Sequence, residues 1–308
     1  MFAVKEDVPL APFTTWKVGG SARWYVEPEA PELPALLALA HAKGVPVFFL
    51  GRGSNVLIDD AGLDGLVVHG WKSMCAIRRV GQSLVEAEAG APLPRLSRFV
   101  ADLGCAGYEF LIGIPGTVGG GVVINAGLRS PMRREIADVL DAVDVVDPDG
   151  EVRALSAANM GLRYRHSKLL GTASYVLRAR FRLEDFKSGP VHIRRRTAHH
   201  LQERRQMQPL SKQTAGSTFK QVRAGPATGW YLEKAGLKGV RVGGAMVSHK
   251  HANWIETSPE ATAADVRELM QAMAHKVLAK FGVILEAEVG FLPDKSFFGL
   301  EPEPPVTQ

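Results

Sequence analysis

The stretch GIPGTVGGGVVINAG, residues 113–127, contains six glycines in fifteen positions. Glycine loses more conformational freedom on folding than any other residue, so this cluster indicates positive φ angles or an unusually close backbone approach. In the triplet Gly119-Gly120-Gly121 no side chain covers the amides, and such N–H groups form a concavity suited to phosphate or another electron-rich oxygen. Two interpretations remain open: a ligand-binding loop, which we favour, and a buried turn at which two backbones pack together.

The same stretch matches neither of the common glycine-rich nucleotide motifs. It lacks the lysine of the P-loop, and its glycines do not have the G-x-G-x-x-G spacing of the Rossmann fingerprint. A nucleotide bound here would therefore belong to another fold.

The composition is that of a globular protein, and it predicts neither a zinc site nor a framework of disulfide bonds. The 308 residues are 46% hydrophobic and 22% charged, which predicts two or three compact units. No apolar run approaches the length of about 18 residues that a transmembrane helix needs. The N-terminus MFAVKEDVPL lacks the basic start and apolar run of a signal peptide. Cys75 and Cys105 have no C-x-x-C spacing, so no zinc site is predicted, and we expect a cytoplasmic protein.

Basic residues gather in one short stretch, although the net charge of +5 is mild. The stretch has no aromatic side chain on which a base could stack, so we do not expect nucleic acid as a partner. A solvated helix face, or a basic rim that attracts an anionic small molecule, fits it better. The stretch comprises Arg194, Arg195, Arg196, His199, His200, Arg204 and Arg205.

Apolar periodicity and turn residues predict alternating helices and strands. The clearest helix covers 262–282, with Thr262 as N-cap, Asp265 in the first turn and Gly282 at the end. Asp149-Gly150 predicts a hairpin. The other predicted helices cover 32–44, 92–103 and the stretch after Pro190, and the other predicted strands cover 45–50, 85–90, 175–186 and 283–289. The last of these strands would place Glu286 and Glu288 on one face.

Seven motifs in a fixed order carry a family resemblance. One of the seven is the glycine-rich stretch itself. The other six are TTWKVGGSA (14–22), LGRGSNVLI (50–58), YRHS (164–167), AGSTFK (215–220), EKAGLKGVRVGGAMVSHKHANWI (233–255) and LEAEV (285–289). This series, from about residue 12 to 290, resembles the UDP-N-acetylenolpyruvoylglucosamine reductases, the flavoenzymes of peptidoglycan synthesis.

The resemblance implies an α+β fold with an FAD-binding region of the vanillyl-alcohol-oxidase/p-cresol-methylhydroxylase type. That region would consist of two subdomains, residues 1–70 and 71–206, followed by a separate α+β substrate domain, residues 207–290. We expect the C-terminal tail, residues 291–308, to return to the first subdomain.

The resemblance also implies FAD as cofactor and NADPH as hydride donor. Neither glycine-rich loop contains a histidine to which flavin could be attached, so we expect non-covalent FAD. Gly51, Gly53, Ser54 and Asn55 would cradle the pyrophosphate, with Arg52 beside them, and the flavin and ribityl chain would lie along Gly113, Ile114, Pro115, Gly116, Thr117, Gly119, Gly120 and Gly121.

Three residues occupy the family's catalytic positions. Arg165 in YRHS would stabilise the charge that develops on the substrate carboxylate, for which a planar guanidinium is well suited. Glu288 in LEAEV would help to hold the enol form. Ser217 in AGSTFK would donate a proton to the substrate α carbon.

The substrate would be UDP-N-acetylglucosamine enolpyruvate, with Tyr164, Lys238 and His251 as candidate contacts. Gln221 is a further candidate, because Gln221-Val222 replaces the Asn-Pro that usually follows this motif in the family. The interval 183–211 is too short for the extra loop that closes over substrate in one subgroup, so the chain resembles the other subgroup.

Two other functions remain open. An FAD-dependent oxidase of the same fold would not need the catalytic trio, and a nucleotide-binding or RNA-binding protein would carry no flavin. For the reductase we expect a monomer.

Overall fold

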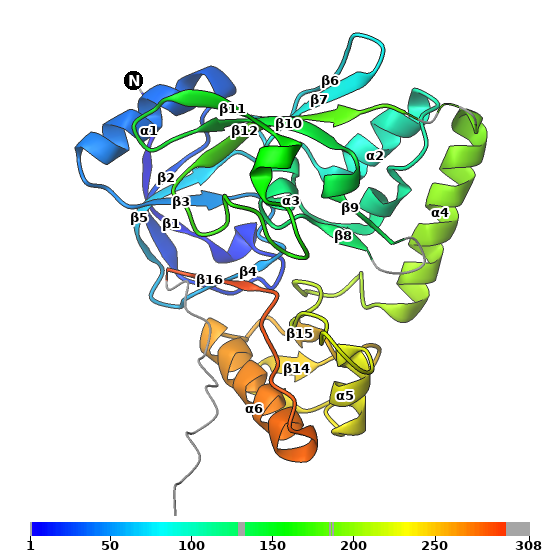
Figure 1. The fold of residues 1–308 in the computed structure, drawn as a ribbon. Coiled ribbons are helices and arrows are strands. Elements are labelled where there is room, and N and C mark those ends of the chain that lie inside the picture. The colour runs from blue at the N-terminus through cyan, green and yellow to red at the C-terminus, as the bar shows by residue number, and fades with distance from the viewer. Residues whose placement is uncertain (1, 129–132, 185, 187, 294–308) are drawn as a thin grey trace, which may run out of the picture. The chain divides into compact units, whose positions relative to one another are not determined.

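The computed structural model describes residues 2–128, 133–184, 186 and 188–293. The chain forms two compact units, coloured along the chain in Figure 1. Unit 1 takes the chain up to Val8, Ala22–Gly53 and Leu63–Gln206, and unit 2 takes Pro9–Ser21, Ser54–Gly62 and the chain from Met207 onward.

Unit 1 contains a four-stranded sheet in the order β1-β2-β5-β3. Strands β2 and β3 both run parallel to β5. Helix α1 lies between β2 and β3 in the chain and confirms the helix predicted over 32–44. The bounds are β1 Lys5–Pro9, β2 Ser21–Val26, α1 Leu33–Ala42, β3 Val47–Leu50 and β5 Leu63–His69, with a 3₁₀ turn at Ala30–Glu32.

A second, five-stranded sheet of unit 1 has the order β11-β10-β12-β7-β6 and is antiparallel throughout. The predicted hairpin at Asp149-Gly150 is confirmed, because Val146 pairs with Val152 across it and Gly150 has a φ of +87°. The bounds are β6 Ile77–Val80, β7 Leu84–Glu88, β10 Leu140–Val146, β11 Val152–Ser156 and β12 Tyr175–Arg182.

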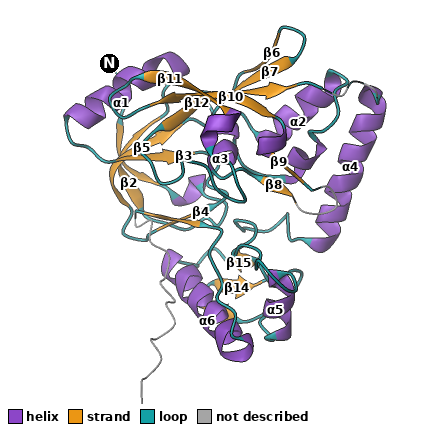
Figure 2. Ribbon diagram, viewed as in Figure 1, coloured by secondary structure: helices purple, strands orange, loops and turns teal. Residues whose placement is uncertain are grey.

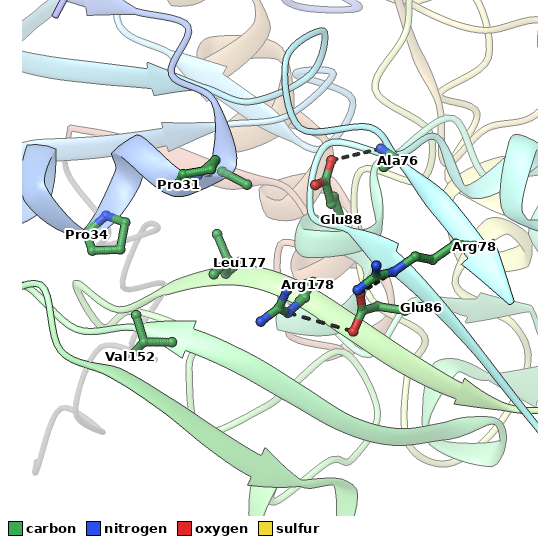
Figure 3. A pocket seen from close by; sticks show the side chains of 10 residues that line it. Pro31, Pro34, Ala76, Arg78, Glu86, Glu88, Val152, Leu177 and Arg178 are labelled. Carbon is green, nitrogen blue, oxygen red and sulfur yellow. Dashed lines mark hydrogen bonds and ion pairs between the residues drawn. The ribbon is translucent and has the colours of Figure 1, made fainter. Parts of the chain in front are cut away.

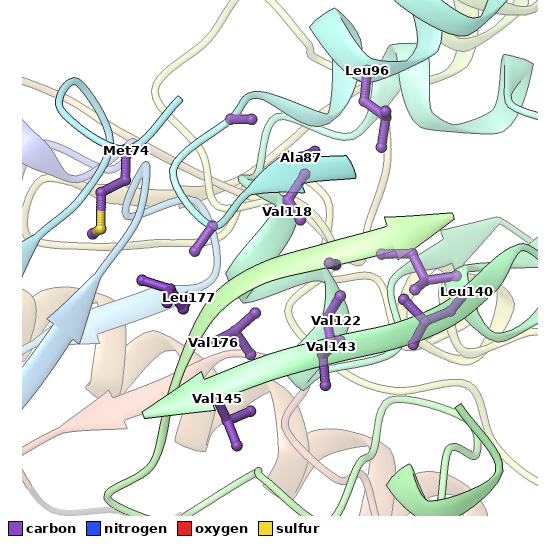
Figure 4. Packing of buried hydrophobic residues seen from close by; sticks show 14 of the residues in the cluster. Met74, Ala87, Leu96, Val118, Val122, Leu140, Val143, Val145, Val176 and Leu177 are labelled. Carbon is purple, nitrogen blue, oxygen red and sulfur yellow. The ribbon is translucent and has the colours of Figure 1, made fainter. Parts of the chain in front are cut away.

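The main core of unit 1 joins residues of both sheets, and a large part of it packs against the five-stranded sheet. Helix α3 packs against β12 and β7, and Figure 4 shows its Val118 and Val122 among the buried residues of β10 and β12. The remaining elements are α2 Leu93–Asp102, α3 Val118–Val123, β8 Gly127–Leu128, β9 Arg134–Glu135 and α4 Gly189–Met207, with 3₁₀ turns at Glu109–Gly113, Ile136–Asp138 and Ala157–Met160.

Unit 2 has its own core around a small antiparallel sheet, β13-β14-β15. Helix α6 packs against β13, β14 and α5 (Figure 2). Its bounds confirm the predicted helix: Thr262 and Asp265 form a capping box, and Gly282 ends the helix with a φ of +67°. The elements are β4 Val56–Ile58, α5 Thr228–Lys234, β13 Arg241–Val242, β14 Ala245–Val247, β15 Ile255–Thr257, α6 Ala263–Phe281 and β16 Gly290–Leu292, with a 3₁₀ turn at Ala11–Phe13.

The strand predicted over 283–289 is wrong. Only Ala287 forms an isolated bridge, to Phe219, and a regular strand begins later, at β16. The segment is nevertheless extended beside 218–220, because the Glu288 N–H donates to the Thr218 carbonyl and the Lys220 N–H donates to the Glu286 carbonyl. The alternation is correct in part, since Leu285 and Val289 are buried and Glu286 is exposed.

The predicted domain boundaries differ in part from the two units. The two sheets of unit 1 lie on either side of residue 70, so the division into two FAD-binding subdomains remains a prediction. Residues 9–21 and 54–62, predicted in the first subdomain, lie in unit 2. Strand β16 returns to pair in parallel with β4, and the tail beyond residue 293 lies outside the described residues.

Candidate functional site

The glycine-rich stretch folds into the 3₁₀ turn that ends at Gly113, a short loop and helix α3. None of its six glycines has a positive φ, so close packing is the reason for glycine at several of them. A Cβ on Gly119 would lie 3.0 Å from the Ala89 Cβ, and a Cβ on Gly121 would lie 2.8 Å from the Ile136 Cδ1. The packing interpretation therefore holds for this face of α3.

Gly120 lies on the opposite, exposed face of α3. The nearest heavy atom to a Cβ there would be the Thr117 Oγ1, at 3.7 Å. No packing among the described residues requires glycine at this position, so a bare backbone here suits the close approach of a ligand.

Gly113 is glycine because a buried arginine occupies the adjacent space. The Nη1 of Arg204, on α4, would lie 2.2 Å from a Cβ at Gly113. Burial lowers the pKa of the Arg204 guanidinium to about 10. In the sequence Arg204 is only one member of a basic stretch, and no signal there distinguishes it from the exposed arginines around it.

The second predicted cofactor loop begins beside the first. A Cβ on Gly51 would lie 2.5 Å from the Thr117 Oγ1, so the two loops pack against each other within unit 1. The His69 Nε2 donates to the Gly51 carbonyl at 3.0 Å, which fixes the position of this peptide. Gly53 has a φ of +58°, a conformation that favours glycine. Arg52 is exposed and lies 4.3 Å over the Trp71 ring.

The remaining two residues of this loop, Ser54 and Asn55, belong to unit 2. The Asn55 side-chain amide donates to the backbone carbonyl of Glu288 at 3.0 Å. The Asn55 carbonyl accepts from the Gly290 N–H at 3.0 Å. A predicted cofactor residue therefore holds the segment that carries a predicted catalytic residue.

The YRHS motif forms a tight hairpin in unit 1. Arg163 and His166 exchange backbone hydrogen bonds, which places Tyr164 and Arg165 at the tip. Arg165 is half-buried and has a φ of +52°, which is uncommon for a residue with a side chain. Its Nη2 donates to the Gly127 carbonyl at 3.0 Å, and its guanidinium lies 5.0 Å from the Tyr164 ring.

Asn125, which was not among the predicted site residues, joins this hairpin to the glycine-rich stretch. It is buried, and its Nδ2 donates to the Arg163 carbonyl at 3.1 Å. Its Oδ1 accepts from the Ala137 N–H at 2.9 Å. The signal available in the sequence was a single polar residue within the apolar run VVINA.

In unit 2 the structure brings the segments of Ser217 and Glu288 together. Ser217 follows Gly216, whose φ is +84°, and forms a bridge with Trp254. The Glu288 N–H donates to the carbonyl of Thr218 at 2.9 Å. Two of the three predicted catalytic residues therefore lie on adjacent extended segments, whereas Arg165 lies in unit 1.

Buried polar atoms without a hydrogen-bond partner among the described residues flank Ser217. They include a donor, the Trp254 Nε1, and two hydroxyls. Buried polar groups normally have partners, so these atoms leave hydrogen-bonding capacity that a water or a ligand could use. The atoms are Gln213 Oε1, Thr214 Oγ1, Thr218 Oγ1 and Trp254 Nε1.

Three of the predicted substrate contacts gather around helix α5. The Gln221 Oε1 accepts from the Thr228 N–H at 3.0 Å, at the first residue of the helix. Lys238 pairs with Glu233, with 2.9 Å between Nζ and Oε2. His251 packs against α5, since its Cε1 would lie 3.2 Å from a Cβ on Gly229. Tyr164, the fourth, lies in unit 1.

Comparison with known proteins identifies the family. The model for the UDP-N-acetylenolpyruvoylglucosamine reductase C-terminal domain matches residues 208–292, and that for an FAD-binding domain matches residues 23–156. The chain is 40% identical to the UDP-N-acetylenolpyruvoylglucosamine reductase of Synechococcus sp. (strain JA-3-3Ab), over 94% of this chain and 91% of the relative. A Caldicellulosiruptor saccharolyticus relative is 39% identical, over 93% and 91% of the two chains.

The chain belongs to the UDP-N-acetylenolpyruvoylglucosamine reductase family. Among solved structures, the reductase of Thermus caldophilus is similar with a TM-score of 0.79 and 34% identity, covering 95% of this chain and all of that one. The predicted α+β fold, with an FAD-binding region and a separate C-terminal domain, is thereby confirmed.

The basic stretch of this family member forms helix α4, which runs beside α2 (Figure 1). Arg194 pairs with Asp102 at 2.8 Å, and Arg196 pairs with the buried Glu109 at 2.7 Å. Part of the positive charge is therefore neutralised inside unit 1.

A cavity of about 440 Å³ lies elsewhere in unit 1, between the start of α1 and the five-stranded sheet (Figure 3). Pro31, Pro34 and Leu177 line one part, and Arg78 and Arg178 lie beside Glu86 in another. None of the predicted site residues lines it. Over the described part of the chain, no group of three His, Cys, Asp or Glu side chains could hold a metal ion. No helix among those described is both long and apolar enough to cross a membrane.

Proposed function

We propose that this protein reduces UDP-N-acetylglucosamine enolpyruvate to UDP-N-acetylmuramate in peptidoglycan synthesis, with NADPH as reductant and FAD as cofactor. The observation that carries the proposal is the similarity to a UDP-N-acetylenolpyruvoylglucosamine reductase, which is 40% identical over 94% of this chain.

The residues of the two loops fit FAD. Neither 51–55 nor 113–121 contains a carboxylate that would repel a pyrophosphate, and Arg52 adds a positive charge. The contact between Gly51 and Thr117 places the two loops side by side, and the exposed Gly120 leaves its backbone open to a ligand. We therefore assign the FAD to Gly51, Arg52, Gly53, Ser54 and Asn55 and to the loop from Gly113 to Gly121.

Bound FAD would accept a hydride from NADPH and supply it to the β carbon of the enolpyruvyl group. The electron pair of the double bond then passes to the α carbon and its carboxylate, where negative charge develops. In the proposal Arg165 stabilises that charge through its fixed guanidinium. Glu288 helps to hold the enol form by hydrogen bonding.

Ser217 completes the reduction by donating its hydroxyl proton to the α carbon. A serine hydroxyl is a weak acid, but it suffices toward a carbanion-like intermediate within hydrogen-bond reach. Support comes from the half-buried position of Ser217 beside the glycine turn and from the segment of Glu288 next to it. Tyr164, Gln221, Lys238 and His251 are the proposed substrate contacts.

We further propose that the protein is a cytoplasmic monomer. We also propose that it binds no nucleic acid, because the ion pairs of α4 with Asp102 and Glu109 use part of the basic charge of that helix. No observation favours an oxidase or a flavin-free nucleic-acid-binding protein over the reductase.

The test separates two half-reactions of one flavin by stopped-flow absorbance. Reduction of FAD by NADPH needs no proton from Ser217, so Ser217→Ala should reduce its flavin at close to the normal rate. Reoxidation by the enolpyruvyl substrate should slow by about 10²- to 10⁴-fold, the usual contribution of a general acid.

Ser217→Cys provides the comparison, because a thiol is a stronger acid of similar reach and should restore more activity than alanine does. Equal slowing of both half-reactions in Ser217→Ala would mean that the serine is structural. Unchanged reoxidation would remove Ser217 as the proton donor.

A further inference from the structure

Asn253 makes an unusual set of contacts with the segment that carries Ser217. It is fully buried in the loop between β14 and β15. Its side-chain Oδ1 accepts from the Phe219 N–H at 3.0 Å, and its Nδ2 donates to the Phe219 carbonyl at 2.8 Å. Its own carbonyl accepts from the Thr218 N–H at 2.8 Å. One asparagine therefore does for this segment what a neighbouring strand does in a sheet.

These contacts satisfy three of the four backbone polar groups of Thr218 and Phe219. The fourth, the Thr218 carbonyl, accepts from the Glu288 N–H. The two residues that follow Ser217 are thus held on one edge by Asn253 and on the other by the segment of Glu288. Phe219 is fully buried, so loss of the Asn253 side chain would remove two hydrogen bonds from a dry environment, where bulk water cannot replace them.

Asn253 is itself held in place. Its backbone N–H donates to the His251 Nδ1 at 3.2 Å, and the next residue, Trp254, forms the bridge with Ser217. The carboxamide carries an NH₂ donor and an oxygen acceptor on one carbon, so it can bond the N–H and the carbonyl of a single residue at once. An apolar side chain offers neither group, and a hydroxyl has only one atom with which to reach both.

We propose that Asn253 is a positioning residue that sets the place of the proton donor Ser217. The inference rests on the proposed function, in which the Ser217 hydroxyl must lie within hydrogen-bond reach of the substrate α carbon. A displacement of about 1 Å at a reacting group can cost about 10²-fold in rate. Asn253 touches neither reactant in this scheme and acts only through the backbone of 217–219.

The first measurement is amide hydrogen exchange, which does not depend on activity. In Asn253→Ala the amides of Thr218 and Phe219 should exchange faster than in the parent chain. Asn253→Asp keeps the volume and the acceptor for the Phe219 N–H but loses the donor to the Phe219 carbonyl. The exchange rates of these amides in Asn253→Asp should therefore lie between those of the parent chain and those of Asn253→Ala. Unchanged exchange in both variants would overturn the proposal.

The second measurement follows both half-reactions of the flavin. In Asn253→Ala the NADPH-driven reduction should be unaffected, whereas reoxidation by the enolpyruvyl substrate should slow by about 10²-fold. In Asn253→Asp the rate of reoxidation should fall by a smaller factor than in Asn253→Ala. Val277→Ala is the control: Val277 is fully buried in α6 and belongs to the same core cluster as Phe219, but it makes none of the hydrogen bonds that hold Thr218 and Phe219. This variant should lower stability without slowing reoxidation. Equal slowing of both half-reactions in Asn253→Ala would mark a general structural defect and refute the proposal.

A double variant separates this proposal from the function on which it rests. If Asn253 acts only through Ser217, adding Asn253→Ala to Ser217→Ala should not slow reoxidation further, because the effects of residues that act as a unit do not add. Additive effects would show that Asn253 acts by another route and would refute its positioning role. If Ser217→Ala alone left reoxidation unchanged, the assignment of Ser217 as proton donor would fail instead.

Discussion

At the scale of the residue, Arg165 combines a charged side chain with a left-handed backbone, φ +52°. That conformation costs a residue with a Cβ about 1–2 kcal/mol, and glycine avoids the cost. We predict that Arg165→Gly leaves the free energy of unfolding unchanged or higher, while Arg165→Ala keeps the strain. Both should lower kcat by about 10²- to 10³-fold, as for loss of one preorganised donor. Denaturant unfolding and steady-state kinetics measure the two effects.

Arg165→Lys is the comparison for charge without the planar fork, and it should recover only part of the activity. A loss confined to KM, with kcat retained, would instead mark Arg165 as a residue for ordinary substrate binding.

His251 is the residue whose protonation should affect the stability of unit 2. Burial, together with the charge of Lys238, holds the pKa of His251 below its ordinary 6.5, and Glu233 opposes this only in part. The unfolded chain therefore takes up this proton at a higher pH than the folded chain does. The stability contributed by neutral His251 is complete above pH 6.5 and is lost as the pH falls toward the lower folded pKa.

We therefore expect the melting temperature to fall between about pH 7.5 and about pH 5.5, on either side of the ordinary histidine pKa. His251→Asn, which keeps an acceptor for the Asn253 N–H, should show a smaller fall, measured by calorimetry at both values. An equal fall in the two proteins would mean that other groups carry the pH dependence.

At the scale of the element, α3 has one packed and one open face, which separates folding from cofactor binding. Gly121→Val would press against Ile136 and Leu93, and such overpacking typically costs about 1–3 kcal/mol of stability. Gly120→Val meets no neighbour closer than 3.7 Å at its Cβ, so the apoprotein should fold normally. We predict that Gly120→Val nevertheless fails to retain FAD.

Thermal unfolding of the apoproteins and titration with FAD measure these two effects. Arg195→Ala, outside both loops, is the control and should retain FAD, which gives the protein its yellow colour. Normal FAD affinity in Gly120→Val would show that this face of α3 is not at the cofactor.

At the scale of the whole molecule, the FAD should be held without a covalent bond. Neither loop contains a histidine, so acid precipitation should release all the flavin into the supernatant. Because FAD binds only the folded chain, it should also raise the melting temperature, by the equivalent of about 2.7 kcal/mol at 100 times its Kd. Absorbance of the supernatant and calorimetry with added FAD check this, and a yellow pellet would contradict it.

The sequence alone determined the features that depend on residues close together in the chain, such as helix ends and tight turns. The ends of α6 follow from Thr262, Asp265 and Gly282, which lie within or beside the helix they terminate. The hairpin at Asp149-Gly150 is likewise a local feature. The order of the motifs was enough to indicate the family, because each motif keeps its residues close together in the chain.

Only the tertiary structure decided which residues hold those motifs in place. The segment 283–289 was predicted as a strand, but its structure depends on residues 218–220, which no local pattern connects with it. Gly119 and Gly121 are glycines because a Cβ there would press against side chains from other elements, which the sequence does not reveal. Asn55 and Glu288 are 233 residues apart and share a hydrogen bond. Hydrogen bonding and packing act between atoms in contact whatever their separation in the chain, so these partners become visible only when the chain has folded.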